Sequence, residues 1–200
     1  MPRRQHPKIL PRFVALAAIN LRPVFFIVPL AVRGADMPTI DSDLDAKTER
    51  HVVLVAPEIH WNTGNIGRTC LGVNAHLHLI KPIGFDLDEK AVKRAGLDYW
   101  HKVKLNTWED FDAFCGHFQP EDREVALLTK NGTQSIWELP ARKRLFLIFG
   151  SETKGLPAAI LESYPQTTYR IPISNQIRCL NLSTAVGIAL YESLRGFQPL

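Results

Sequence analysis

The sequence predicts an α/β domain, a single parallel sheet with helices on both faces. Short apolar runs, the first of them rich in β-branched residues, alternate along the chain with longer segments of helical periodicity. Such alternation is typical of a parallel sheet, because parallel neighbours need a crossover connection that is usually a helix. The chain contains no internal repeats, so its 200 residues fit one domain at 51–200 preceded by an extension at 1–50.

Five runs predict the strands of the sheet. The clearest is 51–56, which reads His-Val-Val-Leu-Val-Ala and is followed by Pro57, as expected of a buried strand. The other predicted strands are residues 76–80, 124–129, 144–149 and 168–173.

Four segments predict helices: residues 63–74, 88–95, 108–118 and 181–195. Segment 88–95 has acidic side chains in its first turn and basic ones in its last, which suits the helix dipole. Segment 108–118 places Trp108, Phe111 and Phe114 near one face, the pattern of an amphipathic helix. Segment 181–195 is apolar on nearly all sides and stops at Gly196, so we expect other elements, or a second subunit, to cover several of its faces.

The net charge of +4 comes from the N-terminal extension. Residues 1–36 contain six basic side chains and one acidic one, whereas the remainder contains 18 basic and 19 acidic ones. The folded part is therefore nearly neutral, and overall basicity does not by itself argue for nucleic-acid binding. Any RNA contact should rest on local clusters, such as Lys90, Lys93 and Arg94.

Residues 13–32 of the extension are apolar, but Arg22, Pro23 and Pro29 interrupt them. A membrane-spanning helix needs about 20 largely apolar residues, so these interruptions argue against one, and Arg22 precedes any plausible cleavage site of a signal peptide. The segment also lacks the serines typical of an organellar transit peptide. We expect a cytoplasmic protein whose natural start is Met37, because fold-like patterning begins only near His51.

Neither the cysteines nor the histidines predict a metal centre. The three cysteines, Cys70, Cys115 and Cys179, are widely spaced and form no Cys-x-x-Cys pair, which indicates reduced thiols. His76 and His78 alternate on a predicted strand, but no carboxylate or thiolate stands beside them. We therefore predict no metal site.

Three polar loops on apolar scaffolding are candidates for one composite pocket. The first, 57–68, reads Pro-Glu-Ile-His-Trp-Asn-Thr-Gly-Asn-Ile-Gly-Arg. Asn62 can cap the following helix and Arg68 can be a solvated side chain; alternatively, both face a polyanion or a developing oxyanion, which a helix N-terminus favours. The spacing of Gly64 and Gly67 does not fit the G-x-G-x-x-G fingerprint of dinucleotide-binding folds.

The other two loops lie at 150–155 and 171–183. The sequence Gly-Ser-Glu-Thr-Lys-Gly at 150–155 follows a strand, so its backbone amides should lie at the carboxyl edge of the sheet, where α/β proteins bind ligands. It lacks the Gly-Lys-Ser/Thr order of a P-loop, and Glu152 can be either a solvated acid or a pocket carboxylate. Asn181 and Ser183 stand where a helix begins, so capping is the simplest interpretation of the third loop.

Together, over residues 51–195, the three loops resemble the motifs of the SPOUT class of RNA 2′-O-methyltransferases. The closest resemblance is to the single-domain subgroup that modifies the tRNA wobble position, the TrmL-type tRNA (cytidine/uridine-34-2′-O)-methyltransferases. The stretches that carry it are residues 57–59, 62–66, 93–99 (Lys-Arg-Ala-Gly-Leu-Asp-Tyr), 155–157 and 181–183. Two rival interpretations are an rRNA 2′-O-methyltransferase of the same class and a non-catalytic RNA-binding protein with this fold.

The resemblance implies an α/β-knot fold with a C-terminal trefoil knot, a homodimer, and S-adenosylmethionine as cofactor. The positions that match the family's cofactor-binding residues are Leu128, Gly150, Ile171, Cys179 and Leu180. Those that match its catalytic residues are Asn62, Arg68, Glu152 and Asn181. The implied RNA-binding residues are Lys93, Arg94 and Lys154. The family usually has Ser where this chain has Cys179, and a thiol is the weaker hydrogen-bond donor.

The implied reaction is a direct displacement in which a ribose 2′-oxygen attacks the sulfonium methyl group, and it needs no metal. Because an arginine stays protonated, we expect Arg68 to act as a fixed cation that stabilises the emerging alkoxide, and not as a base. The implied substrate is the anticodon loop of tRNA, whose unstacked bases can stack on Trp61 and His60. We expect a dimer to assemble the RNA footprint from both protomers.

Overall fold

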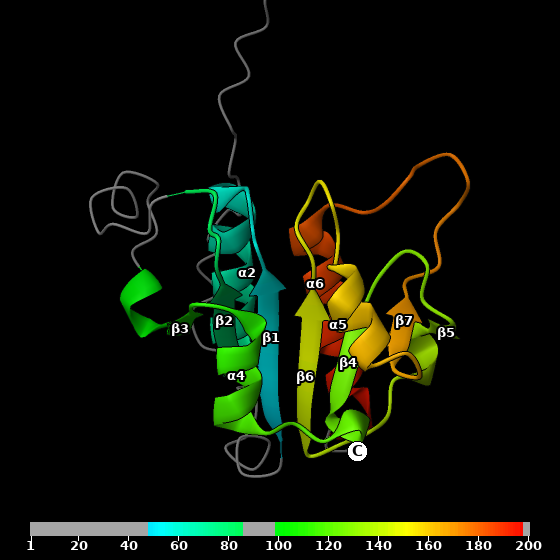
Figure 1. Ribbon diagram of the computed structural model, residues 1–200, viewed down its shortest axis with the longest axis horizontal. Coiled ribbons are helices and arrows are strands. Elements are labelled where there is room, and N and C mark those ends of the chain that lie inside the picture. Colours follow the sequence, from blue (N-terminus) through cyan, green and yellow to red (C-terminus); the bar gives the residue numbers. More distant parts are fainter. Residues whose placement is uncertain (1–47, 86–98, 198–200) are drawn as a thin grey trace, which may run out of the picture. The chain divides into compact units, whose positions relative to one another are not determined.

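The computed structural model describes residues 48–85 and 99–197. They form a parallel sheet of seven strands in the order β3-β2-β1-β6-β4-β7-β5 (Figure 1). The strands are β1 (Glu49–Val55), β2 (His76–Ile80), β3 (Lys104–Trp108), β4 (Val125–Leu128), β5 (Gln134–Ser135), β6 (Arg144–Phe149) and β7 (Thr168–Arg170). The α-helices are α2 (His60–Gly72), α4 (Phe111–Phe118), α5 (Ala158–Ser163) and α6 (Leu182–Leu194). Short 3-10 turns occupy Trp100–Lys102, Asp122–Glu124, Ile136–Glu138 and Arg195–Phe197.

Successive residues of the central strands point to opposite faces of the sheet, and a pair of helices covers each face. Val52 and Leu54 of β1 belong to the core that α2 and α6 complete. Val53 and Val55 belong to the core that α4 and α5 complete. In Figure 1, α4 and α5 lie on the near side of the sheet and α2 and α6 on the far side. The predicted α/β class, with helices on both faces of a parallel sheet, is confirmed.

The helix predicted over 108–118 is confirmed over 111–118, but its predicted start is wrong. Trp108 ends strand β3, and α4 begins only at Phe111. Asp110 caps that helix, because its side chain accepts a hydrogen bond of 2.7 Å from the Ala113 amide. Strand β3 has no apolar run because it lies at the edge of the sheet and is mostly exposed and polar.

Other elements were not predicted or lie outside the described residues. The sequence does not predict β5 or α5, since two and six residues are too few to show a period. The predicted helix 88–95 and the extension up to residue 47, including Met37, lie outside the described residues. Within the part of the chain that the structure describes, no helix has the length and apolar character needed to span a membrane.

Strand β7 is inserted between β4 and β5, although β4 and β5 follow each other in the chain. The later strand therefore packs closely against the connection between the two earlier ones. Gly132 in that connection permits the close approach, because an added Cβ would lie 2.3 Å from the Tyr169 carbonyl carbon. Arg170 of β7 donates from Nη1 to the Gly132 carbonyl oxygen at 2.7 Å. This crossing brings the segments that follow β4 and β7 to the same edge of the sheet.

Candidate functional site

A pocket of about 510 Å³ opens at the carboxyl edge of the sheet, where the three polar loops meet. Its volume lies within the range of roughly 300–1,000 Å³ that is usual for small-molecule sites. Residues 128–131, 149–156 and 179–182 supply most of the lining. Apolar side chains such as Phe149 share it with the charged side chains of Glu152 and Lys154. The pocket therefore suits a ligand that combines an apolar ring with polar or charged ends.

Hydrogen bonds between three side chains join the three loops in this pocket. Asn62 Nδ2 donates to Glu152 Oε1 at 2.9 Å, and Asn181 Nδ2 donates to Asn62 Oδ1 at 2.9 Å. Each of the three side chains comes from a different loop, and all three line the pocket. The structure thus brings together three of the four predicted catalytic residues.

A second set of contacts fixes Glu152 in place. Its Oε2 accepts a hydrogen bond of 2.9 Å from the Glu58 backbone amide. The neighbouring Thr153 hydroxyl donates to the Glu58 carboxylate. Both carboxylate oxygens of Glu152 therefore have a partner on the first loop. Of the two possibilities that the sequence left open, Glu152 is a pocket carboxylate and not a solvated acid.

The loop at 150–155 closes tightly on itself. Ser151 and Gly155 exchange backbone hydrogen bonds of 3.2 and 2.9 Å, and Gly155 has a φ of +72°, a value that favours glycine. An added Cβ at Gly150 would lie 1.9 Å from the carbonyl carbon of Gly155. Glycine at 150 is thus required by the close approach of the two backbone segments, and the loop presents main-chain atoms to the pocket.

Of the two predicted helix caps, the structure confirms Asn181 but not Asn62. Asn181 caps α6, because its Oδ1 accepts from the amides of Ser183 and Thr184 at 2.9 and 3.4 Å. Asn62 is not a cap, since α2 begins at His60 and Ile59 holds the N-cap position without a side-chain hydrogen bond. The earlier start of α2 puts Asn62 inside the first turn, where its amide is available to bridge Glu152 and Asn181.

Arg68, the fourth predicted catalytic residue, does not line the pocket. Its side chain is exposed on α2, and its guanidinium lies 4.6 Å from the centre of the Tyr99 ring. Six residues separate Arg68 from Asn62, so the two side chains point about 120° apart around the helix axis. The structure therefore does not bring Arg68 to the pocket of its own chain.

All five residues predicted to bind the cofactor line the pocket: Leu128, Gly150, Ile171, Cys179 and Leu180. Of the predicted RNA-binding residues, Lys154 lines it, whereas Lys93 and Arg94 lie outside the described residues. Lys130 and Tyr169, which the sequence did not single out, also contribute to the lining. Because Lys130 directly follows the predicted strand 124–129, the sequence could have placed it at the carboxyl edge of the sheet, where the pocket lies.

A model of a known protein family matches most of the chain. The model of the SpoU rRNA Methylase family matches residues 49–191, which include the whole described sheet and all three loops. The chain belongs to this family. The α/β-knot fold class that the sequence predicts is the fold of the family's solved members, and that prediction is confirmed.

Two relatives within the family resemble most of the chain. A candidate tRNA (cytidine(34)-2′-O)-methyltransferase of Listeria monocytogenes is 45% identical over 148 residues, which cover 72% of this chain and 86% of the relative. The tRNA (cytidine(34)-2′-O)-methyltransferase of Burkholderia cenocepacia is 41% identical over 151 residues, which cover 74% of this chain and 97% of the relative.

Solved structures of the SpoU family show the same fold. One structure, from work on the 2-OH methylation of C/U34 on tRNA, is 40% identical to this chain and superposes with a TM-score of 0.68. The match covers 74% of this chain and 96% of the chain in that structure. An AdoMet-bound rRNA methyltransferase from Sinorhizobium meliloti also reaches a TM-score of 0.68, covering 76% of this chain and 58% of its own. At 22% identity, this second likeness shows the shared fold alone.

Proposed function

We propose that this protein transfers a methyl group from S-adenosylmethionine to the ribose 2′-hydroxyl of the wobble nucleotide, cytidine or uridine 34, of tRNA. The observation that carries the proposal is the Asn181–Asn62–Glu152 hydrogen-bond network, which closes the three family motifs around one pocket. Relatives that are 41–45% identical over most of their length carry this activity in their names.

The residues of the pocket fit S-adenosylmethionine. A cradle of main-chain atoms in the loop at 150–155, which closes tightly because Gly150 has no Cβ to collide with Gly155, lies beside apolar side chains that can cover an adenine ring. Leu128, Gly150, Ile171, Cys179 and Leu180 would hold the cofactor, largely through backbone atoms. When bound, the cofactor supplies an electrophilic methyl group on a sulfonium centre. Because backbone atoms would make these contacts, Cys179 could replace the usual Ser and still line the pocket.

The protein must align a ribose hydroxyl with the methyl group and stabilise the oxygen as its proton leaves. Glu152 has both oxygens engaged by the first loop, so its role is to orient Asn62, and through it Asn181, at the pocket. Arg68 supplies a permanent cation that lowers the pKa of the hydroxyl and stabilises the alkoxide, and the proton leaves to an RNA phosphate or to water. Preorganised groups of this kind typically contribute about 10²–10³-fold in rate.

Arg68 can act in this way if the protein is a homodimer in which Arg68 of the partner subunit reaches the pocket. The exposed residues of α2 recur at helical spacing as Asn65, Arg68 and Gly72. On the adjoining helix α6, Tyr191 is 55% exposed and lies one turn from the half-buried Ile188. The two helices pack against each other, and each leaves a surface exposed, that of α6 with an aromatic and an aliphatic side chain. A twofold contact would use this same surface on both protomers.

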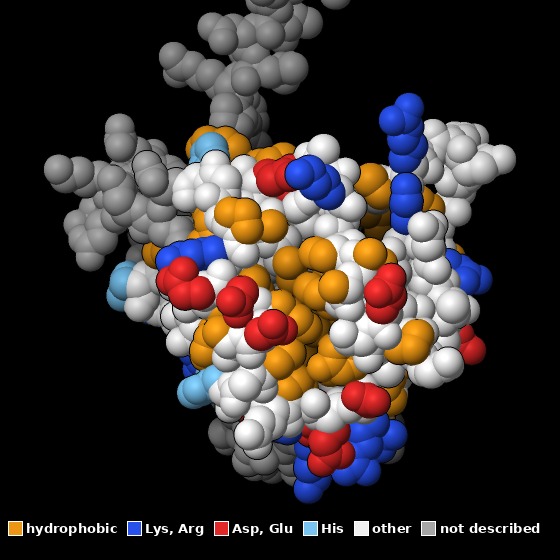
Figure 2. Space-filling view, viewed as in Figure 1, with side chains coloured by type: hydrophobic (Ala, Val, Ile, Leu, Met, Phe, Trp, Pro, Cys, Tyr) orange, Lys and Arg blue, Asp and Glu red, His pale blue; other side chains and the backbone are white. Residues whose placement is uncertain are grey.

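RNA recognition would rest on local features of the pocket mouth. In Figure 2, acidic side chains lie among the basic ones on the near face, in keeping with the nearly neutral body. Lys130 and Lys154 line the pocket and suit phosphate contacts. At the start of α2, Trp61 is 53% exposed, with its ring 4.6 Å from that of His60, and both can stack on unpaired bases. The RNA-binding roles of Lys93 and Arg94 also belong to this proposal.

The test is methylation of total tRNA by the purified protein with methyl-labelled S-adenosylmethionine, followed by nuclease mapping. We expect label in a 2′-O-methylated nucleotide at position 34, and none with the Glu152→Gln variant. Label confined to rRNA would instead assign the protein to the rRNA-modifying enzymes of the class. RNA binding without label in any RNA would support the non-catalytic alternative.

A further inference from the structure

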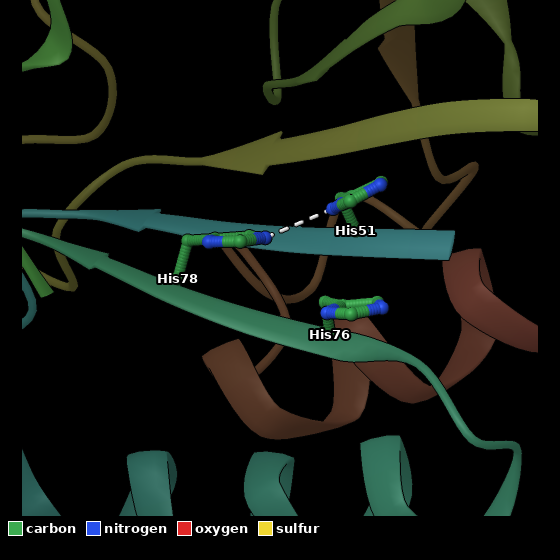
Figure 3. Close-up of side chains that lie close together, drawn as sticks. All are labelled: His51, His76 and His78. Carbon is green, nitrogen blue, oxygen red and sulfur yellow. Dashed lines mark hydrogen bonds between the residues drawn. The ribbon is translucent and has the colours of Figure 1, made fainter. Parts of the chain in front are cut away.

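Three histidines cluster toward the amino-terminal end of the sheet, away from the pocket. His51 of β1 is the register partner of His76 of β2, and His78 follows two residues later on the same face. One ring nitrogen from each histidine lies within 4.8 Å of the other two. Figure 3 shows the three side chains gathered over β1 and β2, with the ring of His76 beside that of His51. Strand pairing thus adds a third imidazole to the His-x-His pair visible in the sequence.

A chain of hydrogen bonds defines which nitrogens carry protons. The Trp108 indole can only donate, and its Nε1 lies 3.2 Å from His78 Nδ1, which must accept. His78 Nε2 therefore carries the proton and donates to His51 Nδ1 at 2.9 Å. His51 Nε2 in turn donates to Glu49 Oε1 at 2.9 Å. The lone pair of His51 Nδ1 therefore points into the cluster, while a carboxylate holds the far side of the ring.

A carboxylate behind an imidazole is the usual support of a metal-ligating histidine, since it fixes the tautomer and raises the basicity of the ligand nitrogen. His76 is only half-buried, and the Glu49 side chain is 52% exposed, which leaves the cluster open to solvent on one side.

We propose that His51, His76 and His78 form a binding site for a divalent transition-metal ion of the zinc type, with Glu49 orienting His51. Imidazole nitrogens suit Zn²⁺, and three of them leave the fourth tetrahedral position to water. Zinc–nitrogen bonds of about 2.0–2.1 Å place tetrahedral ligands about 3.3 Å apart. To bind the ion, the nitrogens of His51 and His78 would separate by about 0.4 Å from their present 2.9 Å, the His76 nitrogen would move in from within 4.8 Å, and the stacked rings would turn so that their lone pairs converge.

Metal binding at this site has a consequence for Trp108. Coordination through His78 Nε2 moves its proton to Nδ1, where it faces the indole N–H of Trp108. Two donors cannot share that contact, so the metal competes with the hydrogen bond between Trp108 and His78. Removing the indole N–H with Trp108→Phe should therefore tighten metal binding, whereas an ordinary loss of core packing should weaken it.

The experiment is an isothermal calorimetric titration of the untagged full-length protein with Zn²⁺ alone. A Cys179→Ser background removes the exposed thiol as a competing ligand. We expect one zinc per chain, a loss of affinity of at least about tenfold for His76→Asn and for Glu49→Ala, and a gain for Trp108→Phe. His101→Gln, at an exposed histidine outside the cluster, should change nothing. The Trp108 indole N–H signal in NMR spectra should shift on zinc addition.

The variants at His76 and Glu49 change side chains that are not fully buried, so they should fold even where a change at His51 or His78 does not. Absence of zinc binding, or binding that His76→Asn leaves unchanged, would overturn the proposal. Weaker binding by Trp108→Phe would overturn it too, because the indole N–H would then not compete with the metal for His78. None of these residues lines the pocket, so the outcome is independent of methyl transfer.

Discussion

The side-chain amide of Asn181 donates to Asn62 Oδ1 at 2.9 Å, although 119 residues separate the two along the chain. Asn181 also caps α6, and Asn62 lies in the first turn of α2, so this contact ties the amino-terminal ends of two adjacent helices together. Glu152 extends the link to the loop after β6. The pocket therefore depends on a few polar contacts between loops whose scaffolds are otherwise held by apolar packing.

Asn62→Asp should disrupt this network. Asn62 is only 6% exposed, and its Nδ2 donor would become an oxygen facing the Glu152 carboxylate across the present 2.9 Å contact. We expect methylation to fall by about 10²–10³-fold, and stability to fall by about 1–3 kcal/mol because a buried partner is lost. Turnover assays and thermal unfolding measure the two effects. Asn106→Asp, at an exposed position on β3, is the control and should leave both unchanged.

Gly150→Ala should abolish cofactor binding. The new Cβ would lie within 1.9 Å of the Gly155 backbone, so the loop at 150–155 must open and lose its cradle. Isothermal titration with S-adenosylmethionine checks this. Gly116→Ala is the matched control, because that glycine lies inside α4 with nothing within 4 Å of an added Cβ. It should bind the cofactor normally and gain about 0.5–1 kcal/mol of stability. Normal cofactor binding by Gly150→Ala would contradict the cradle.

The sequence predicts the loops of the site better than it predicts their relation in space. Asn62, Glu152 and Asn181 meet as the motifs imply, since each follows a strand that ends at the same edge of a parallel sheet. Arg68 does not join them, because the direction of its side chain depends on where α2 begins, and the sequence indicates no cap at Ile59. The contact of His51 with His78 could not be predicted either, as it depends on which strands are neighbours.

Cysteine alkylation should distinguish the three thiols. Cys70 is fully buried, and burial raises its pKa to about 12, so it should stay protonated and unreactive in the folded protein. Burial also raises the pKa of Cys115. Cys179 is exposed at the pocket and should react first with iodoacetamide. Peptide mass spectrometry should show that saturating S-adenosylmethionine slows this labelling. Equal rates with and without cofactor would remove Cys179 from the cofactor site.

Arg68→Lys should keep RNA binding but lose most turnover. The substitution retains one positive charge, yet it replaces a planar guanidinium with a point charge that cannot make the same paired hydrogen bonds. Filter binding of tRNA and single-turnover methylation separate the two properties. Arg123→Lys, at a 66% exposed side chain on the Asp122–Glu124 turn, is the matched control. Near-normal turnover by Arg68→Lys would argue against a specific role for the guanidinium.

Mixing two inactive variants should restore activity if Arg68 serves the partner's pocket. In a heterodimer of Arg68→Ala with Glu152→Gln, one pocket has an intact Glu152 and faces an intact Arg68 of the partner subunit. Random exchange makes about half the dimers mixed, each with one working pocket of two, so activity should reach about a quarter of the wild-type value. If Arg68 served its own pocket, every pocket in the mixture would lack one of the two residues, and no activity would return.

Two further mixtures serve as controls. Mixing Arg68→Ala with Asn62→Asp should also restore activity. Mixing Glu152→Gln with Asn62→Asp should not, because those two residues belong to the same pocket.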